Sequence, residues 1–309
     1  MIDTYDSGST THTLHLSIAN LVFNICSQNL PLLLEYDTSY KQFLVTQNDP
    51  SAVNIDISLD LKETLPDISS ITRIFETPES WYMLSDSNGK YIVFQPPNNP
   101  KIDPVWLARI DSDLRHIDVF CDKVQLTDGS NMEGIANPVR YPLDQILLIN
   151  CLLGKGLLIH SAGIIINDRG YLFAGPSGAG KSTICSIFQE LKQYAILSDD
   201  RMVVRKSGHD LLMYGTPWPG EAGIAVNDSA VLQGIFFLTH SNENRIKELA
   251  PQESLDNFFK VASLPWYDKN DLQKSLDFCE DLLQQVKMYE LNFRPGPEIV
   301  EDIISFVSG

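Results

Sequence analysis

The sequence predicts an α+β to α/β protein with two domains, a β-rich domain over residues 1–136 and a domain of alternating helices and strands over residues 137–309. Three observations support this prediction. Apolar and polar positions alternate in short runs between turns up to residue 125, which is typical of half-buried strands. Residues 127–138 are rich in Gly, Ser, Asn and Pro, as at a domain boundary. After residue 141, strand, helix and turn signals alternate.

Length and composition are those of an ordinary globular protein. The chain has 309 residues, of which 43% are apolar and 20% are charged, and this excludes a disordered or fibrous protein. The 40 acidic side chains outnumber the 23 basic ones, so the net charge is −17. A protein this acidic repels the nucleic-acid backbone and anionic membranes, and we expect neither as a partner.

The excess of acid lies mainly in the first half of the chain. Residues 1–150 carry 20 acidic and 9 basic side chains, a net charge of −11. Two explanations are open at this point. The charge either keeps the protein soluble or attracts a basic partner to the first domain.

Neither the cysteines nor the start of the chain indicates an exported or membrane protein. The five cysteines are an odd number without a CxxC pair, so neither a disulfide framework nor a zinc site is predicted. The first 13 residues are polar and acidic, unlike a signal peptide. The most apolar stretch, residues 146–159, is too short and too interrupted to span a bilayer. We therefore expect a cytoplasmic protein, and the sequence leaves its oligomeric state open.

Strands are expected throughout the first domain. Leu14, Leu16 and Ile18 alternate with polar residues. Asn88-Gly89 stands between two apolar runs, which is a strong hairpin signal. Further strand-like runs cover residues 21–25, 43–46, 52–59, 81–86, 91–95, 105–111 and 116–122.

The second domain begins with a helix after Pro142, a residue that suits a first helical turn. Apolar residues 145–153 form this helix, and Gly154 ends it. Strands are predicted at residues 157–160, 163–167, 171–174, 195–197, 211–215, 235–240 and 288–293, and helices at residues 182–192, 273–286 and 297–307.

The strongest motif follows the strand at residues 171–174. Residues 175–182 match the phosphate-loop pattern G-x-x-x-x-G-K-[ST] in full, with a buried strand before them and a helix after them. Glycines let backbone N–H groups turn towards phosphate oxygens, and the helix N-terminus adds positive charge. Lys181 is expected to reach the β- and γ-phosphates, and Ser182 to bind Mg²⁺. The predicted ATP site consists of Gly175, Pro176, Ser177, Gly178, Ala179, Gly180, Lys181, Ser182 and Thr183.

The surroundings of this loop are unusual. Only Asp168, Arg169 and Gly170 separate the strand at residues 163–167 from the strand at residues 171–174, so the two are expected to form an antiparallel hairpin. In common nucleotide-binding folds, the phosphate-loop strand instead opens a parallel βαβ unit. The sequence therefore indicates a different branch of phosphate-loop architecture.

Two adjacent carboxylates end the next strand. Asp199 and Asp200 follow residues 195–197, where a phosphate-loop site needs a partner for Mg²⁺. Neighbouring side chains of an extended chain point in opposite directions, so one carboxylate can hold the metal while the other takes a proton from an attacking hydroxyl. A surface turn is the alternative. His160, one hairpin arm before the loop, is either a core residue or part of the site.

Further candidates lie downstream. Residues 214–223 contain two prolines and three glycines and form a shaped loop. Within it, Glu221 could face the site and Trp218 could stack on a substrate, although a rigid surface turn is equally compatible with the composition. Arg245 is a candidate contact for the nucleotide or the substrate.

Residues 157–205 resemble the catalytic domain of HPr kinase/phosphorylase, in the phosphate-loop group related to phosphoenolpyruvate carboxykinase. The shared features, in order, are a histidine, a hairpin, the loop GPSGAGKS, a helix, and a strand that ends in Asp-Asp. The resemblance implies a mixed sheet with flanking helices, bound ATP and Mg²⁺, and transfer of the γ-phosphoryl group.

The resemblance also implies roles for individual residues. Asp199 is the expected catalytic base, and Asp200 is expected to hold the metal together with Ser182. Lys181 is expected to bind the β- and γ-phosphates, and His160 to lie beside the acceptor and Asp199.

The sequence departs from this family in three places. Thr183 stands where the family usually has Glu, the arginine-bearing loop that supports phosphorolysis is not found, and the first half differs from the usual regulatory domain. Kinase chemistry is therefore expected to carry over better than the family's own protein substrate or its reverse reaction. The expected acceptor is a Ser or Thr hydroxyl of a peptide or protein, a basic one if the first domain attracts it. The alternatives are a small-molecule hydroxyl acceptor, and a nucleotide-binding switch or ATPase without transfer.

Overall fold

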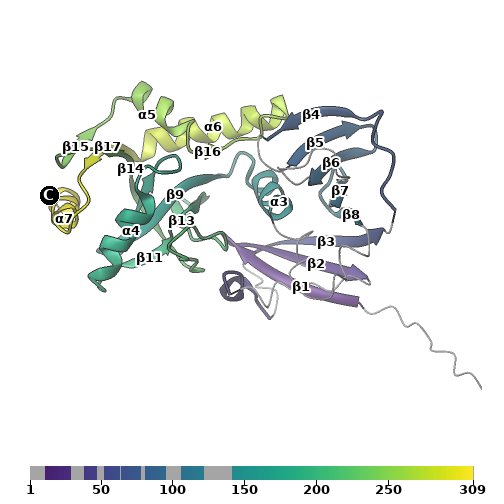
Figure 1. Cartoon of the computed structure of the whole chain (residues 1–309), viewed down its shortest axis with the longest axis horizontal. Coiled ribbons are helices and arrows are strands. Elements are labelled where there is room, and N and C mark those ends of the chain that lie inside the picture. Colours follow the sequence, from purple (N-terminus) through teal and green to yellow (C-terminus); the bar gives the residue numbers. More distant parts are fainter. Residues whose placement is uncertain are drawn as a thin grey trace, which may run out of the picture. The chain divides into compact units, whose positions relative to one another are not determined.

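The computed structural model describes residues 11–28, 38–46, 52–62, 64–77, 81–94, 106–121 and 141–308 (Figure 1). The chain forms two compact units, each with a mixed sheet and flanking helix, so the α+β prediction is confirmed. The first unit comprises residues 1–37 and 44–148, and the second comprises Thr38–Phe43 and Ile149–Gly309. The boundary predicted at residues 136 and 137 falls outside the described residues, and the two units divide at residues 148 and 149.

The first unit is built on an eight-stranded sheet. Its strands are β1 (Thr11–Ile18), β2 (Leu21–Gln28), β3 (Val53–Lys62), β4 (Thr72–Glu76), β5 (Trp81–Asp86), β6 (Gly89–Phe94), β7 (Trp106–Ile110) and β8 (His116–Cys121). The order in the sheet is β1-β2-β3-β8-β7-β6-β5-β4. β3 pairs in parallel with β2 and β8, and the other pairs are antiparallel.

The hairpin predicted around Asn88 is confirmed. β5 and β6 are antiparallel, and Asp86 pairs with Gly89, so Ser87 and Asn88 form the two-residue loop. The turn therefore lies one residue earlier than Asn88-Gly89. The side chain of Asp86 accepts the N–H of Asn88 at 2.7 Å, a local bond that is typical of Asp at the start of a turn.

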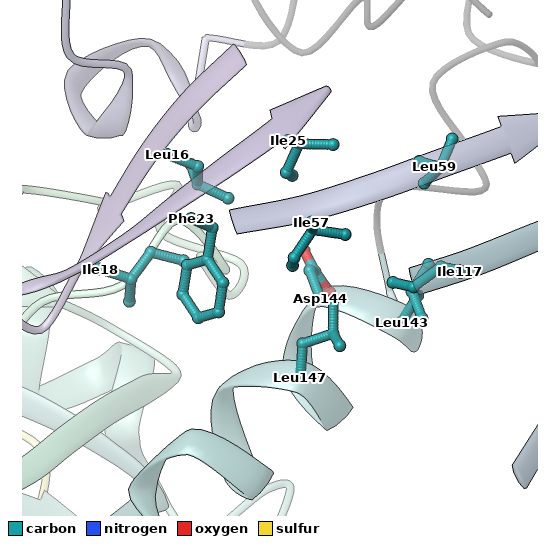
Figure 2. Close-up of a pocket in the computed structure, with 10 residues that line it drawn as sticks. All are labelled: Leu16, Ile18, Phe23, Ile25, Ile57, Leu59, Ile117, Leu143, Asp144 and Leu147. Carbon is teal, nitrogen blue, oxygen red and sulfur yellow. The ribbon is translucent and has the colours of Figure 1, made fainter. Parts of the chain in front are cut away.

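Helix α3 (Leu143–Leu152) lies close to the helix predicted at residues 145–153, and its first residues, up to Leu148, belong to the first unit and lie against this sheet. Leu143 and Leu147 face Phe23 and Ile57 of the strands (Figure 2). The void between them is about 10 Å³, no larger than one water molecule, so this region is a packed core. The other residues around it are Leu16, Ile18, Ile25, Leu59, Ile117 and Asp144.

The second unit is built on a nine-stranded sheet. Its strands are β9 (Gly156–Ile166), β10 (Arg169–Ala174), β11 (Ala195–Ser198), β12 (Arg201–Ser207), β13 (Asp210–Tyr214), β14 (Ser229–His240), β15 (Arg245–Glu248), β16 (Ala262–Ser263) and β17 (Lys287–Phe293). The main order is β10-β9-β12-β13-β14-β17-β15, and β11 and β16 also pair with β9. β14 pairs in parallel with β10 and β17, and the other pairs are antiparallel. The pairing of β10 with β14 closes a circuit of strands.

Helices cover both faces of this sheet (Figure 1). α4 (Lys181–Glu190) and α7 (Glu298–Ser308) share one core with the sheet, and α5 (Pro251–Phe258) and α6 (Lys269–Gln285) share the other. The alternation of side chains along the strands explains the two layers. In β10, for example, Phe173 packs in the first core and its neighbour Leu172 in the second.

None of the helices in the described ranges combines the length and the apolar character needed to cross a membrane.

A short piece of the N-terminal chain completes the second unit. In Thr38–Phe43, Tyr40 and Phe43 are 2% and 0% exposed. The indole Nε1 of Trp218 donates a hydrogen bond of 3.0 Å to the hydroxyl of Tyr40. The strand predicted at residues 43–46 is wrong, because Phe43 ends a 3₁₀ turn and Leu44 forms only an isolated bridge with Leu16. Residues 137–309 alone do not contain the whole of this unit.

We predict that Phe43→Ala destabilises the protein by about 3–5 kcal/mol, because it leaves a cavity where a fully buried ring packs. Lys41→Ala in the same turn is the control, and it should leave the free energy of unfolding nearly unchanged because Lys41 is exposed. Urea unfolding followed by circular dichroism measures both values. Similar losses in the two variants would show that Phe43 does not anchor this segment.

Candidate functional site

The hairpin expected before the phosphate-loop motif is confirmed. β9 and β10 are antiparallel, and Ile166 pairs with Arg169 across Asn167 and Asp168, which both have positive φ. Such φ values are typical of the two-residue turns that join twisted strands. Because β10 also pairs in parallel with β14, the carboxyl ends of these two strands lie at the same edge of the sheet. Residues 175–182 begin at this edge.

The loop between β10 and α4 contains a tight turn. The N–H of Ala179 donates to the carbonyl of Pro176 at 3.1 Å, and Gly178 has φ +79° at the third position, as a type II turn requires. Gly180 has φ +104°, and a Cβ at this position would lie 2.5 Å from the ring of Phe293. Two glycines of the motif are therefore required by backbone conformation, and one of them also by space.

Helix α4 directs its N-terminus at the same place. Gly180 precedes the helix without a side-chain cap, and the N–H of Ile184 donates to the carbonyl of Gly180 at 2.9 Å. The N–H groups of the first turn, at Lys181, Ser182 and Thr183, have no acceptor within the helix. Together with the positive end of the helix dipole, these groups form a site suited to an anion.

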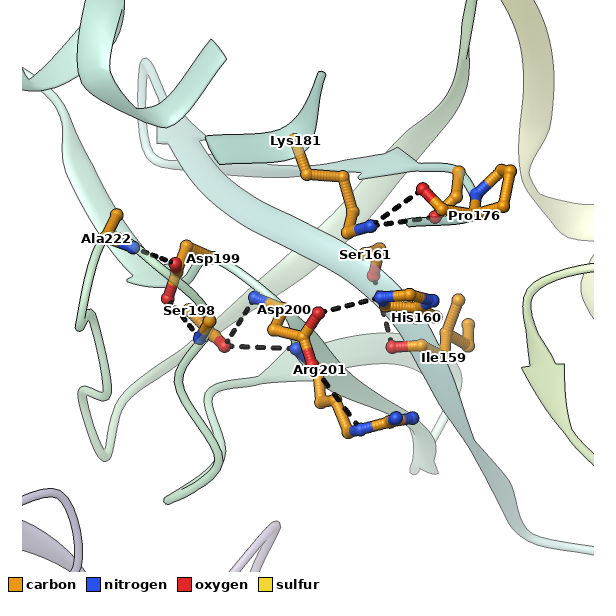
Figure 3. Close-up of polar contacts among 12 residues, drawn as sticks. Ile159, His160, Ser161, Pro176, Lys181, Ser198, Asp199, Asp200, Arg201 and Ala222 are labelled. Atoms are coloured by element: carbon orange, nitrogen blue, oxygen red, sulfur yellow. Dashed lines mark hydrogen bonds and ion pairs between the residues drawn. The ribbon is translucent and has the colours of Figure 1, made fainter. Parts of the chain in front are cut away.

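Lys181 folds back over the loop from the start of this helix. Its Nζ donates to the carbonyl oxygens of Gly175 and Pro176 at 2.9 and 3.1 Å (Figure 3). Burial lowers the pKa of Lys181, and the negative charge of Asp200 acts against this shift. The buried ammonium adds a cation beside the N–H groups of the loop.

The carboxylate of Asp199 is buried and bound to the backbone of a later loop. Its oxygens accept hydrogen bonds from the N–H groups of Gly220 at 2.9 Å, Ala222 at 2.7 Å and Ile224 at 3.1 Å. Hydrogen bonds to an ionised acceptor are about twice as strong as neutral ones. Glu221 stands between two of the anchored residues, so Asp199 fixes the backbone that carries Glu221.

Asp200 points in the opposite direction from Asp199, towards the hairpin (Figure 3). Its Oδ1 lies 2.7 Å from Nε2 of His160 on β9, and its Oδ2 lies 3.5 Å from Nε of Arg201. Burial by itself raises the pKa of Asp200, but the hydrogen bond and charge of His160, followed by the charges of Arg201 and Lys181, lower it overall. The carboxylate therefore stays ionised at neutral pH.

These parts meet in a cleft with a volume of about 200 Å³. Its lining combines the loop and the helix start, where Lys181 is the cation, with the carboxylates of Asp200 and Glu221. The lining residues are His160, Ser177, Gly178, Gly180, Lys181, Ser182, Thr183, Asp200, Gly220, Glu221 and His240. The cleft thus places an anion subsite beside a carboxylate–imidazole pair.

Most of the site residues predicted from the sequence line this cleft. The others lie behind the lining or elsewhere in the second unit. Gly175 and Pro176 hold the ammonium of Lys181 through their carbonyl groups. Ala179 closes the turn of the loop. Asp199 is enclosed by the 220–224 backbone and does not line the cleft.

Two candidates for substrate binding lie away from the cleft. Trp218 is 7% exposed and is bonded to Tyr40, so its ring does not face the cleft. Arg245 lies on β15 opposite Asn292 of β17 and does not line the cleft either. Of the three downstream candidates, only Glu221 does.

Sequence reasoning missed two lining residues, Gly220 and His240. The N–H of Gly220 is held by Asp199, a bond between residues that are 21 positions apart. His240 is the last residue of the strand predicted at residues 235–240. A histidine at the end of a strand is the one sequence signal that could have indicated a site residue here. Only the parallel pairing of β14 with β10 brings it to the loop.

The cleft offers hydroxyl and carboxylate oxygens to a metal ion. The hydroxyls come from Ser177, Ser182 and Thr183, and the carboxylates from Asp200 and Glu221. No group of three or more His, Cys, Asp or Glu side chains in the described part of the chain is placed to hold a metal by itself. This donor set suits Mg²⁺, which is usually held by one or two carboxylates together with waters and substrate phosphates.

No protein-family model matches the chain, and no curated protein matches its sequence. Among solved structures, it matches the structure of the Hpr(Ser) kinase/phosphatase from Coxiella burnetii at 12% identity. The match covers 49% of this chain and 88% of that chain, with a TM-score of 0.28. By its sequence identity and its TM-score, this is a weak structural neighbour, and we assign no function from it.

We predict that Gly180→Ala destabilises the protein more than Gly208→Ala. Both glycines have positive φ, so alanine strains either position by about 1–2 kcal/mol. Only at Gly180 would the new Cβ also meet a ring, that of Phe293, whereas nothing lies within 4 Å of it at Gly208. Overpacking should add about 1–3 kcal/mol at Gly180. Chemical denaturation measures the difference, and equal losses would contradict the close approach of Gly180 to Phe293.

Replacing His160 should raise the pKa of Asp200. His160→Phe keeps a ring but removes the contacts that lower this pKa most, while the burial that raises it remains. In the wild-type protein, the lowered pKa of native Asp200 increases the free energy of unfolding. This increase is fully present above the ordinary carboxyl pKa, and it is lost as the pH falls through the native pKa. The variant should retain less of this contribution.

Carboxyl-carbon NMR titration measures this pKa, and Asp200→Asn assigns the resonance. An unchanged titration of Asp200 in His160→Phe would show that the contact with His160 does not control the carboxylate.

Proposed function

We propose that the protein is a Mg-ATP-dependent kinase, related in its second unit to HPr kinase/phosphorylase, that transfers the γ-phosphoryl group to a Ser or Thr hydroxyl of a peptide or protein. One observation carries this proposal. Most residues of a complete phosphate-loop motif, and an ionised carboxylate paired with a histidine, line the same cleft. Phosphoryl transfer to a hydroxyl needs both an anion subsite and a group that receives the hydroxyl proton.

The loop and the start of α4 would hold the β- and γ-phosphates. Their N–H groups are fixed by the turn and by the helix, so they need no rearrangement as charge develops. The ammonium of Lys181 would exchange carbonyl partners for phosphate oxygens. Ser182, with the carboxylate of Glu221, would hold Mg²⁺, which neutralises phosphate charge when bound. Positioning and charge neutralisation account for most of phosphoryl-transfer catalysis.

The acceptor hydroxyl belongs beside Asp200 in this proposal. The hydroxyl oxygen attacks the γ-phosphorus, the new O–P bond forms as the bond to the β–γ bridging oxygen breaks, and ADP leaves. The hydroxyl proton passes to the carboxylate of Asp200. His160, at 2.7 Å from that carboxylate, orients it.

This division of roles differs from the expectation that Asp199 is the base and Asp200 holds metal. Asp199 already binds three backbone N–H groups and does not line the cleft. Asp200 lines the cleft and is paired with His160. These contacts favour Asp200 as the base, with Asp199 positioning the loop that carries Glu221.

Acceptor recognition by the first unit stays a prediction. The net charge of −11 over residues 1–150 favours a basic acceptor.

The test follows labelled γ-phosphate from ATP to water and to peptides that contain Ser or Thr. Asp200→Asn should lower the rate by about 10²–10⁴-fold and leave ATP affinity nearly unchanged, because a base acts in the transition state. Asp199→Asn should instead lower the melting temperature, because it weakens three buried hydrogen bonds. Lys181→Ala should weaken ATP binding and abolish turnover.

Lys247→Ala is the matched control for the loss of a lysine, since Lys247 is an exposed residue paired with Glu253. Wild-type protein that binds no Mg-ATP would contradict the proposed function. Equal rates in the wild type and Asp200→Asn would contradict only the assignment of the base.

A further inference from the structure

Strand β14 ends beside the phosphate loop. Its Phe237 pairs with Ala174, the last residue of β10, so His240, three residues further on, lies level with the loop that follows β10. Nε2 of His240 lies 3.1 Å from the carbonyl oxygen of Gly178. A carbonyl oxygen only accepts hydrogen bonds, so Nε2 carries the hydrogen and donates it.

Phe293 holds the ring of His240 in this place. The two residues are paired between β14 and β17, and their ring centroids are 5.2 Å apart with 33° between the planes. Both rings also lie against the loop, because a Cβ on Gly180 would be 2.5 Å from Phe293 and 3.1 Å from Cε1 of His240. His240 is nevertheless exposed and lines the cleft.

The contact with Gly178 bears directly on anion binding. A phosphate loop turns its N–H groups towards the anion, and a carbonyl oxygen facing the same way would repel it. Gly178 has positive φ, and nothing lies within 4 Å of a Cβ built on it, so its restraint from within the loop is the turn bond from Ala179 to Pro176. The imidazole N–H of His240 supplies a restraint for its carbonyl group.

We propose that His240 is a positioning residue of the phosphate loop, which holds the carbonyl of Gly178 so that the N–H groups of the loop stay directed at the polyphosphate of a bound nucleotide. This inference rests on the proposed function, which supplies the nucleotide as the ligand. It adds His240 to the site as a residue that acts on the nucleotide through the phosphate loop. Loss of the donor should therefore raise the KM for ATP much more than it lowers kcat.

Two substitutions separate the hydrogen bond from the packing. His240→Leu keeps an apolar contact with Phe293 and removes the donor, whereas His240→Gln keeps a terminal N–H donor of similar reach. In calorimetric titrations with Mg-ATP, His240→Leu should bind about fivefold to tenfold more weakly than the wild type, the effect of one lost hydrogen bond. His240→Gln should stay within about twofold of the wild type. Equal weakening in both variants, or unchanged affinity in His240→Leu, would overturn the inference.

A second measurement decides the inference without nucleotide. In protein labelled with nitrogen-15 histidine, the His240 signal is the one that disappears in His240→Gln. At about pH 8, where an ordinary imidazole is neutral, this signal should show the Nε2–H tautomer. An Nδ1–H tautomer would overturn the inference. The failure of wild-type protein to bind ATP contradicts the proposed function instead, and the tautomer then still decides whether His240 donates to the loop.

Discussion

The site depends on strand β9 and on the point where this strand changes partners. Residues 156–160 pair with β12 and β16, and residues 161–166 pair with β10 and β11. At the change, the carbonyl of His160 accepts the N–H of Gly175 at 3.4 Å, and the N–H of Ser161 donates to the carbonyl of Asp200 at 2.9 Å. The phosphate loop and the acidic turn are therefore bonded to two consecutive residues of one buried strand. That common support brings groups from residues 160, 175–182 and 200 into one cleft.

Burial then gives two adjacent carboxylates different surroundings. A buried charge is costly unless hydrogen bonds or an opposite charge compensate it. Asp199 is compensated by three backbone N–H groups, and Asp200 by the imidazole of His160 and the guanidinium of Arg201. The first arrangement shapes a loop, whereas the second leaves an ionised carboxylate at the surface of a cleft.

The loop that carries Glu221 is held by hydrogen bonds to two separate parts of the second unit. Asp199 holds its backbone at residues 220–224. Trp218, just before this stretch, bonds to Tyr40, and the side-chain amide of Asn227, just after it, donates to the carbonyl of Gln42 at 3.2 Å. The N-terminal chain therefore takes part in shaping one wall of the cleft, through a segment of six residues. This gives a physical reason why the second unit includes Thr38–Phe43.

The sequence by itself determined the features that depend on neighbouring residues. The hairpin of β9 and β10, the glycines of the loop and the start of α4 all follow from short connections and local backbone geometry. The antiparallel pairing of the hairpin and the α+β class could be predicted for the same reason.

Only the tertiary structure decided the rest. The surroundings of Asp199 depend on N–H groups more than 20 residues later, and the place of His240 depends on a parallel strand pair that leaves no local signal. The hydrogen bond of Trp218 to Tyr40 likewise joins parts of the chain that are distant in sequence, because hydrogen bonding acts through space and not along the chain.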